Sequence, residues 1–120
     1  MVRALLDILD ALGPMHRLKI VHRDLRWDNI LRYSSGGEKW FIIDFDDSAE
    51  LQKDGRDWII VEGRSIRNMD PRSHAPELFD SRNHNEKVDI WSIGYLIETS
   101  DLNLSTELGQ IKNVCMHTNP

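Results

Sequence analysis

Cysteine is almost absent from this sequence, in which Cys115 carries the only thiol. A single cysteine excludes an intramolecular disulfide and is typical of proteins in a reducing compartment. No apolar run approaches the length that crosses a bilayer. The N-terminus resembles a signal peptide only at a glance, because Asp7 and Asp10 interrupt its apolar residues at helical spacing. We therefore expect mature protein in the cytoplasm or nucleus, without a membrane partner.

Positive charge is also in short supply. The 120 residues contain 15 Lys and Arg against 20 Asp and Glu, which gives a net charge of −5. This balance argues against nucleic acid as a partner, because non-specific binding to it requires a basic surface. With 40% hydrophobic and 29% charged residues, the composition is that of an ordinary soluble globular protein, either one domain or part of one.

Hydrophobic periodicity predicts helices at both ends of the chain. Apolar residues from Leu5 to Leu12 recur at helical spacing, and Gly13-Pro14 should end or kink this helix, because proline has no N–H and its ring crowds the preceding turn. The run "KVDIWSIGYLIETS" at 87–100 is apolar almost all round, which predicts a buried helix. A last helix is predicted at 109–117.

Strands are predicted in the first half of the chain. "NILRY" at 29–33 and "KWFIID" at 39–44 are short apolar segments joined by the turn "SSGGE". Residues 46–74 are polar and aperiodic apart from "WIIV" at 58–61. So long an irregular segment inside a compact domain is usually functional or mobile.

The stretch "VHRDLRWDNIL" at 21–31 sets polar residues between apolar ones. His22-Arg23-Asp24 followed by Asn29 fits the pattern H-R-D-L-x-x-x-N, the catalytic loop of protein kinases. A polar turn between two strands would also produce such a stretch. Three further motifs, in the order and spacing of a kinase domain, favour the catalytic loop.

Those three motifs follow at intervals along the chain. Asp44-Phe45-Asp46 resembles D-F-G with its glycine replaced, and Ala75-Pro76-Glu77 matches A-P-E. "VDIWSIG" at 88–94 resembles the buried helix that comes after A-P-E. Each match alone is weak, but four in order are strong. The chain resembles the C-terminal lobe of a eukaryotic-type protein kinase.

This resemblance implies an α+β fold, a kinase-like C-terminal lobe that is mostly helical. A small β-hairpin would carry the catalytic loop and the metal-binding strand. Residues 1–120 would form a partial kinase domain, divided into a helix before the catalytic loop (1–18), the catalytic loop and metal-binding hairpin (19–45), an activation segment (46–77) and a buried helix (86–100).

The implied activity is phosphoryl transfer from ATP and Mg²⁺ to protein serine or threonine hydroxyls. Asp24 would accept the proton of the incoming hydroxyl, and Arg26 would contact the transferred phosphate. Asn29 and Asp44 would hold magnesium against the nucleotide, since Mg²⁺ prefers oxygen ligands. A basic residue two positions after Asp24 favours a serine/threonine kinase over a tyrosine kinase.

Five further residues have structural roles by the same resemblance. His22 and Phe45 would belong to an internal hydrophobic stack, and Asp89 would tie the catalytic-loop backbone to the buried helix. Arg23 would allow regulation by a phosphate on Ser48, Ser65 or Ser73. Glu77 would pair with an arginine that kinases carry further along the chain, and the 120 residues of this sequence do not include that arginine. His16, His74, His84 and His117 lack metal-ligand spacing, and we interpret them as ordinary polar positions.

The sequence departs from the kinase pattern in several places. Asp46 stands where glycine would reach positive φ, and Trp27 replaces a common proline. The run 68–74 has no threonine, where serine/threonine kinases usually carry a Gly-Thr pair that helps to seat the substrate. Before His22 there is no Gly-rich loop and no strand lysine. We therefore expect the isolated chain to be inactive.

Two other functions stay open on the sequence. A catalytically dead, kinase-like binding module would use its exposed nucleotide face to contact a partner. A small-molecule phosphotransferase of the aminoglycoside or choline kinase type would also carry a metal strand like "IIDFDDSAE" at 42–50. Ala75-Pro76-Glu77 followed by "DIWSIG" is typical of protein kinases. We therefore rank the small-molecule phosphotransferase below the protein kinase and the binding module.

Overall fold

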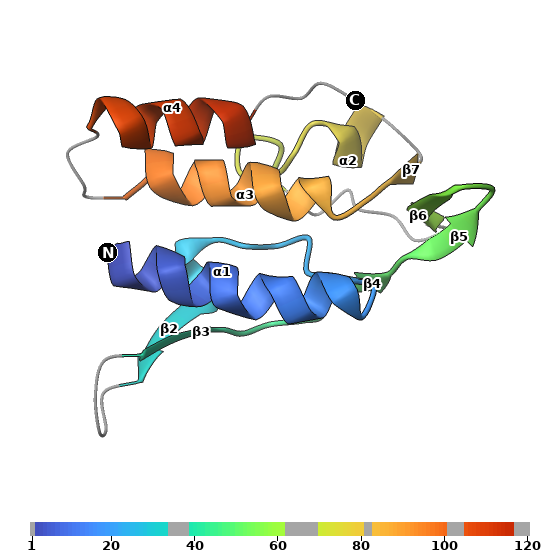
Figure 1. Cartoon of the computed structure of the whole chain (residues 1–120), viewed down its shortest axis with the longest axis horizontal. Coiled ribbons are helices and arrows are strands. Elements are labelled where there is room, and N and C mark those ends of the chain that lie inside the picture. Colours follow the sequence, from blue (N-terminus) through green and yellow to red (C-terminus); the bar gives the residue numbers. More distant parts are fainter. Residues whose placement is uncertain (1, 34–38, 62–69, 81–82, 101–104, 117–120) are drawn as a thin grey trace.

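A computed structural model of the chain describes residues 2–33, 39–61, 70–80, 83–100 and 105–116. It combines four α-helices with small antiparallel sheets in these parts of the chain. In Figure 1 the helix α3 lies between α1 and α4, and the strands extend from this helical body. The helices are α1 (Val2–Arg17), α2 (Glu77–Asp80), α3 (Lys87–Glu98) and α4 (Thr106–Cys115), with a short 3₁₀ turn η1 at Trp27–Asn29.

Three small sheets are formed by strands that pair antiparallel. The strands β1 (Ile20–Val21) and β4 (Ala49–Glu50) form one pair, and β2 (Ile30–Tyr33) and β3 (Lys39–Ile42) form a second. The third sheet has the order β5-β6-β7, with β5 at Gln52–Asp54, β6 at Asp57–Val61 and β7 at Asn83–His84. The turn predicted at 34–38 lies outside the described residues.

One hydrophobic core joins α1 to α3 and to the first strands. Its buried side chains are Leu5, Ile8, Leu12, Leu25, Ile30, Ile42, Ile93, Leu96 and Ile97. A second cluster, which includes Val21, Ile60, Leu78 and Trp91, lies around the other end of α3. Because α3 contributes to both clusters, it is buried on most sides. No helix in the described segments is long and apolar enough to cross a membrane.

The prediction that Gly13-Pro14 ends or kinks the first helix is wrong as regards the end, because α1 continues through Pro14 to Arg17. Pro14 is exposed, so the hydrogen bond that it cannot donate is lost on the solvent side. The last turn is instead held by tertiary contacts. Met15 packs against the core, and the His16 ring donates from Nε2 to Asp89 Oδ2 at 2.9 Å. Tertiary packing therefore overrides the local proline signal.

The interpretation of residues 46–74 as aperiodic is also wrong in part. The segment contains β4, β5 and β6, and β5 and β6 form a hairpin that turns at Gly55, where φ is +65°. The two turn residues are Gly55 and Arg56, and glycine at the first of them favours a tight hairpin turn. The last helix begins at Thr106 rather than 109, because the Ser105 hydroxyl caps it by accepting from Leu108 N–H at 3.1 Å.

Gly94 lets α3 and α4 approach closely. A Cβ at this position would lie 2.4 Å from Met116 Cγ and 3.0 Å from Lys112 O. Since the backbone oxygen cannot yield easily, Gly94→Ala is expected to separate the helices and lower the free energy of unfolding by about 1–3 kcal/mol. Urea denaturation followed by circular dichroism measures this change.

Gly109→Ala is the matched control for this substitution. An added Cβ at Gly109, which lies in α4, meets nothing within 4 Å. The change should leave stability unaltered or raise it by up to about 1 kcal/mol, because alanine favours helix. Equal behaviour of the two variants would show that close helix packing at Gly94 does not matter.

Candidate active site

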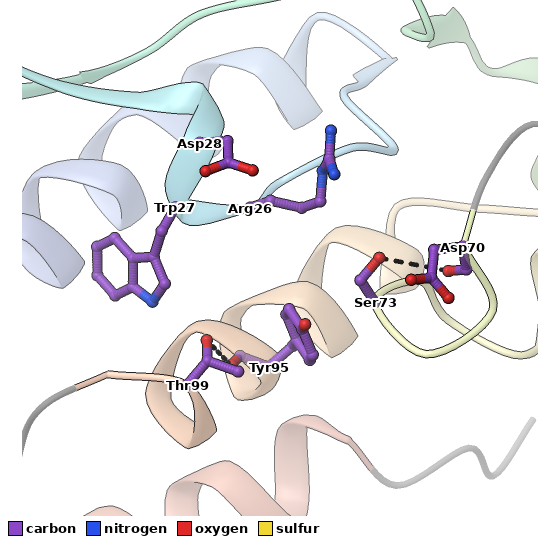
Figure 2. A pocket seen from close by; sticks show the side chains of 7 residues that line it. All are labelled: Arg26, Trp27, Asp28, Asp70, Ser73, Tyr95 and Thr99. Carbon is purple, nitrogen blue, oxygen red and sulfur yellow. Dashed lines mark hydrogen bonds between the residues drawn. The ribbon is translucent and has the colours of Figure 1, made fainter.

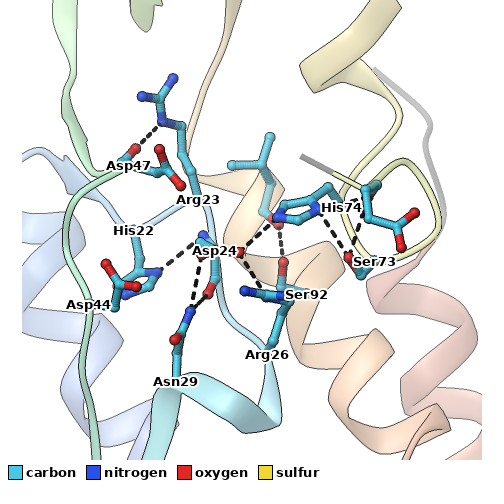
Figure 3. A network of polar contacts seen from close by, with 12 residues as sticks. His22, Arg23, Asp24, Arg26, Asn29, Asp44, Asp47, Ser73, His74 and Ser92 are labelled. Atoms are coloured by element: carbon cyan, nitrogen blue, oxygen red, sulfur yellow. Dashed lines mark hydrogen bonds and ion pairs between the residues drawn. The ribbon is translucent and has the colours of Figure 1, made fainter. Parts of the chain in front are cut away.

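The residues of the kinase-like motifs meet beside the N-terminal part of α3. The loop between β1 and β2 carries His22 to Asn29, and the end of β3 leads to Asp44. Residues 70–75 approach the same loop from the other side, as Figure 3 shows for Ser73 and His74. Segments about 50 residues apart in the chain therefore contribute to one polar network.

Asp89 holds the start of this loop. Its carboxylate is fully buried and accepts hydrogen bonds from the backbone N–H of His22 and of Arg23, both at 2.9 Å. His16 on α1 donates to the same carboxylate. Asp89 thus connects α1, the loop and α3, and a buried carboxylate with several donors satisfies the rule that buried polar groups are hydrogen-bonded.

His22 links the loop to the strand that leads to Asp44. Its Nδ1 accepts from Asp24 N–H at 3.1 Å, and its Nε2 donates to Ile43 O at 3.0 Å. One nitrogen accepts and the other donates, which assigns the Nε2–H tautomer. The ring also packs edge-on against Phe45, with centroids 4.9 Å apart. Phe45 is nevertheless 46% exposed.

Arg23 is buried and adopts an unusual backbone conformation. Its φ is +73°, a region that non-glycine residues rarely occupy. The Asp89 bond to its N–H and the 2.6 Å bond from its Nε to Asp47 O hold this conformation. Its Nη1 also lies 3.4 Å from His84 Nε2. The guanidinium implied to receive a phosphate is therefore turned inward in this conformation.

The Asp24 carboxylate is surrounded by donors and is only 7% exposed. Oδ1 lies 2.8 Å from His74 Nε2 and 3.0 Å from Arg26 Nε, while Oδ2 accepts from Asn29 Nδ2 at 3.1 Å. The Arg26 contact is an ion pair and not a directed hydrogen bond, because the N–H does not point at the oxygen. Burial raises the pKa of Asp24, but the hydrogen bond from His74 and the Arg26 charge outweigh burial, and the net pKa is lowered.

A backbone hydrogen bond connects Asn29 to the residue before Asp44. Asn29 O accepts from Ile43 N–H at 2.8 Å, one residue before Asp44. The Asn29 amide nitrogen donates to Asp24 O and Oδ2, so its oxygen stays available. Asp44 is exposed and has a φ of +60°. The positive φ expected at Asp46 is found at Asp44 instead, where aspartate tolerates it better than most residues do.

The sequence interpretation missed three histidines of this network. His16 contacts Asp89, His84 contacts Arg23, and His74 contacts Asp24. Their interpretation as ordinary polar positions is wrong, because a histidine without metal-ligand spacing can still pair with a buried charged side chain. A usable signal existed for His74, which directly precedes Ala75-Pro76-Glu77, a segment that the resemblance already sets beside the catalytic loop.

His74 is 3% exposed and lies between two acceptors. Its Nε2 faces Asp24 Oδ1 and its Nδ1 faces Asp70 O, each at 2.8 Å. Burial lowers the pKa of His74, but the hydrogen bonds to Asp24 and to the Asp70 carbonyl outweigh burial, and the net pKa is raised.

Trp27 and Glu77 complete the candidate residues. Trp27, in place of the common proline, donates from Nε1 to Leu96 O at 3.0 Å and so fastens the loop to α3. Glu77 Oε1 is buried, and no group in the described part of the chain donates a hydrogen bond to it.

A hollow of about 220 Å³ opens beside Arg26. Figure 2 shows its lining, which comes from the loop, from the segment before Ala75 and from α3. The lining residues are Arg26, Trp27, Asp28, Asp70, Ser73, Tyr95 and Thr99. Arg26, which lines this hollow, also contacts the Asp24 carboxylate.

Comparison with known proteins gives consistent results. The family model described as "Protein kinase domain" matches residues 1–106. Crinkler effector protein 8 of Phytophthora infestans is 34% identical over 100 residues, which are 82% of this chain and 15% of that protein. Serine/threonine-protein kinase pakB of Dictyostelium discoideum is 36% identical over 90 residues, 75% of this chain and 10% of that protein.

A third relative is cAMP-dependent protein kinase catalytic subunit 3 of Drosophila melanogaster, which is 36% identical over 91 residues, 76% of this chain and 14% of that protein. The chain thus spans no more than 15% of the length of these three curated relatives. The family match covers most of the chain itself. This chain belongs to the protein kinase domain family.

Proposed function

We propose that the chain is the part of a serine/threonine protein kinase C-terminal lobe that orients the substrate hydroxyl and holds magnesium, for phosphoryl transfer from Mg-ATP. The observation that carries this proposal is the adjacency of Asp24, Asn29 and Asp44. Asn29 donates to Asp24 through its side chain and bonds to the residue before Asp44 through its backbone. Serine/threonine kinases among the relatives support the substrate class.

The donor set fits magnesium. Asp44 offers an exposed carboxylate, and Asn29 offers an amide oxygen whose nitrogen is already bonded. Magnesium typically takes one or two protein carboxylates and completes its shell with water and phosphate oxygens. Bound magnesium would neutralise charge on the ATP phosphates.

The remaining residues act on the substrate hydroxyl. Asp24 Oδ2 keeps one lone pair after accepting from Asn29, and that lone pair would accept the hydroxyl proton. Arg26 adds positive charge on the side of the hollow, where it would contact the transferred phosphate. The hollow is open to solvent and is suited to a side chain of a polypeptide substrate. The activity and the substrates of the whole protein are part of this proposal.

Metal binding tests the proposal without the need for a complete kinase. We expect Mn²⁺, which shares the oxygen ligands of Mg²⁺, to broaden the NMR signals of the Asn29 side-chain amide and the Asp44 backbone amide first. Asp44→Asn should weaken this effect about tenfold or more, because it removes a charged ligand. Asparagine also tolerates the positive φ at this position, so the backbone is preserved.

Asp54→Asn is the matched control for the metal experiment. It removes the same charge from an exposed position on β5, and it should leave the broadening at Asn29 unchanged. The metal site would be refuted if Mn²⁺ broadened the NMR signals near all exposed carboxylates to the same extent. The same holds if neither Asp44→Asn nor Asp54→Asn changed the broadening.

A second candidate, a kinase-like binding module, is favoured by one observation. Leu31 and Phe41 pair across β2 and β3 and are 44% and 38% exposed. They leave apolar surface open on the β2–β3 hairpin, which a nucleotide base or a protein partner would cover. A chain that binds neither Mn²⁺ nor ATP while it retains this surface would favour the binding module.

A further inference from the structure

We propose that His74 is a positioning residue, a positively charged side chain that fixes the Asp24 carboxylate and couples the segment before Ala75 to the catalytic loop. This inference rests on the proposed function for the role of Asp24. The contact joins residues 50 positions apart, and both side chains are buried. The run 68–74 contains no threonine, and among its described residues, 70–74, His74 reaches Asp24.

The charge follows from what the two ring nitrogens face. Asp70 O and Asp24 Oδ1 can only accept hydrogen bonds at neutral pH, and each lies 2.8 Å from a nitrogen of His74. A neutral imidazole donates from one nitrogen only, so both contacts are satisfied only by the imidazolium. His22 provides the contrast, because one of its nitrogens accepts and the other donates.

The groups around His74 agree with a fixed positive charge. Asp24 attracts it, and the positive charge of Arg26 opposes it. The Asp70 carboxylate adds attraction from its exposed position, where it also pairs with Arg72. Ser73 Oγ lies 3.1 Å from Nδ1 and donates to Asp70 O at 3.3 Å. Although Ser73, His74 and Asp24 follow one another in space, a protonated His74 cannot accept the Ser73 proton. Ser73 is therefore not an activated nucleophile.

The contact decides which oxygen of Asp24 is left for the substrate. His74 and Arg26 both lie on Oδ1, whereas Oδ2 has the single Asn29 contact. Fixing Oδ1 prevents the carboxylate from rotating and holds Oδ2 in place. Since the pKa of His74 is raised, this hold is complete below the ordinary histidine pKa and is lost as pH rises through the raised value.

NMR titration of the 120-residue chain tests the ionic contact. In wild-type protein the His74 midpoint should lie above the ordinary value for histidine, and in Asp24→Asn it should move to lower pH. Asp10→Asn is the control, because it removes an equal charge from the exposed side of α1 and should leave the His74 midpoint unchanged. A His74 midpoint that Asp24→Asn leaves unchanged would overturn the ionic contact.

Positioning has its own signal, the Asn29 side-chain amide, which donates to Asp24. In the wild-type chain this signal should shift with the same midpoint as His74, and in His74→Gln, which lacks the charge, the transition should disappear. A residue that only fills space would not produce this coupling, so an Asn29 signal that stays constant through the His74 midpoint refutes the proposal.

If a variant fails to fold, the titration of the wild-type chain alone tests the proposal, through the common midpoint of His74 and the Asn29 amide. The same data separate this inference from the proposed function, because they depend on neither metal nor phosphate. Loss of Mn²⁺ binding with the His74–Asn29 coupling intact would count against the metal site only. Intact Mn²⁺ binding without the coupling would count against His74 only.

Discussion

Asp89→Ala is expected to lower the free energy of unfolding by about 3–5 kcal/mol, because it removes one partner of a buried charged network. The N–H groups of His22 and Arg23 and the His16 ring would lose their acceptor inside the protein. Unpaired buried donors bear the full cost of lost hydration. Domains are stable by only about 5–15 kcal/mol, so this single change removes a large share of the stability.

Urea denaturation monitored by circular dichroism measures this loss, with Glu98→Ala as the control. Glu98 ends the same helix α3 but is exposed, so its substitution should change stability by no more than about 0.5 kcal/mol. A change of the same small size for Asp89→Ala would mean that solvent or other groups replace the carboxylate, contrary to its burial.

Asp24→Asn is expected to reduce phosphate transfer by about 10²–10⁴-fold in the complete protein, the range typical of a lost acid–base group. Asparagine has nearly the same size, but it cannot accept the hydroxyl proton and it loses the charge that attracts His74 and Arg26. The measurement is incorporation of labelled phosphate from Mg-ATP into a protein substrate rich in serine and threonine.

A denaturation curve of the Asp24→Asn variant must accompany the rate, so that loss of catalysis is separated from loss of folding. Asp10→Asn removes an equal charge from the exposed side of α1 and should keep the wild-type rate. Transfer by Asp24→Asn within a few-fold of the wild-type rate would contradict the role given to this carboxylate.

The family and the main helices could be predicted because they depend on local order in the sequence. The H-R-D and A-P-E matches keep their spacing, and the all-round apolar pattern of 87–98 reflects burial of α3. The β5–β6 hairpin was missed because most of its side chains are exposed and show no alternation. Its one local signal is Gly55, which has positive φ at the first position of the turn.

The site was harder to predict than the fold, since its partners come from distant segments. Nothing near His74 in the sequence specifies Asp24, and nothing near Pro14 reveals that His16 is fastened to α3. The positive φ at Arg23 likewise accompanies long-range bonds, from its N–H to Asp89 and from its Nε to Asp47 O. Such features require a three-dimensional structure.

The reach of Asp89 also has a consequence for synthesis on the ribosome. The loop at 22–29 is translated early, but the carboxylate that fixes its first two amides arrives 66 or 67 residues later. A growing chain therefore carries the loop without its anchor until α3 has emerged. Contacts over such separations form slowly, and the exposed apolar face of α1 must meanwhile be kept from aggregation. A nascent chain that stalls before residue 89 thus lacks the acceptor for the amides of His22 and Arg23.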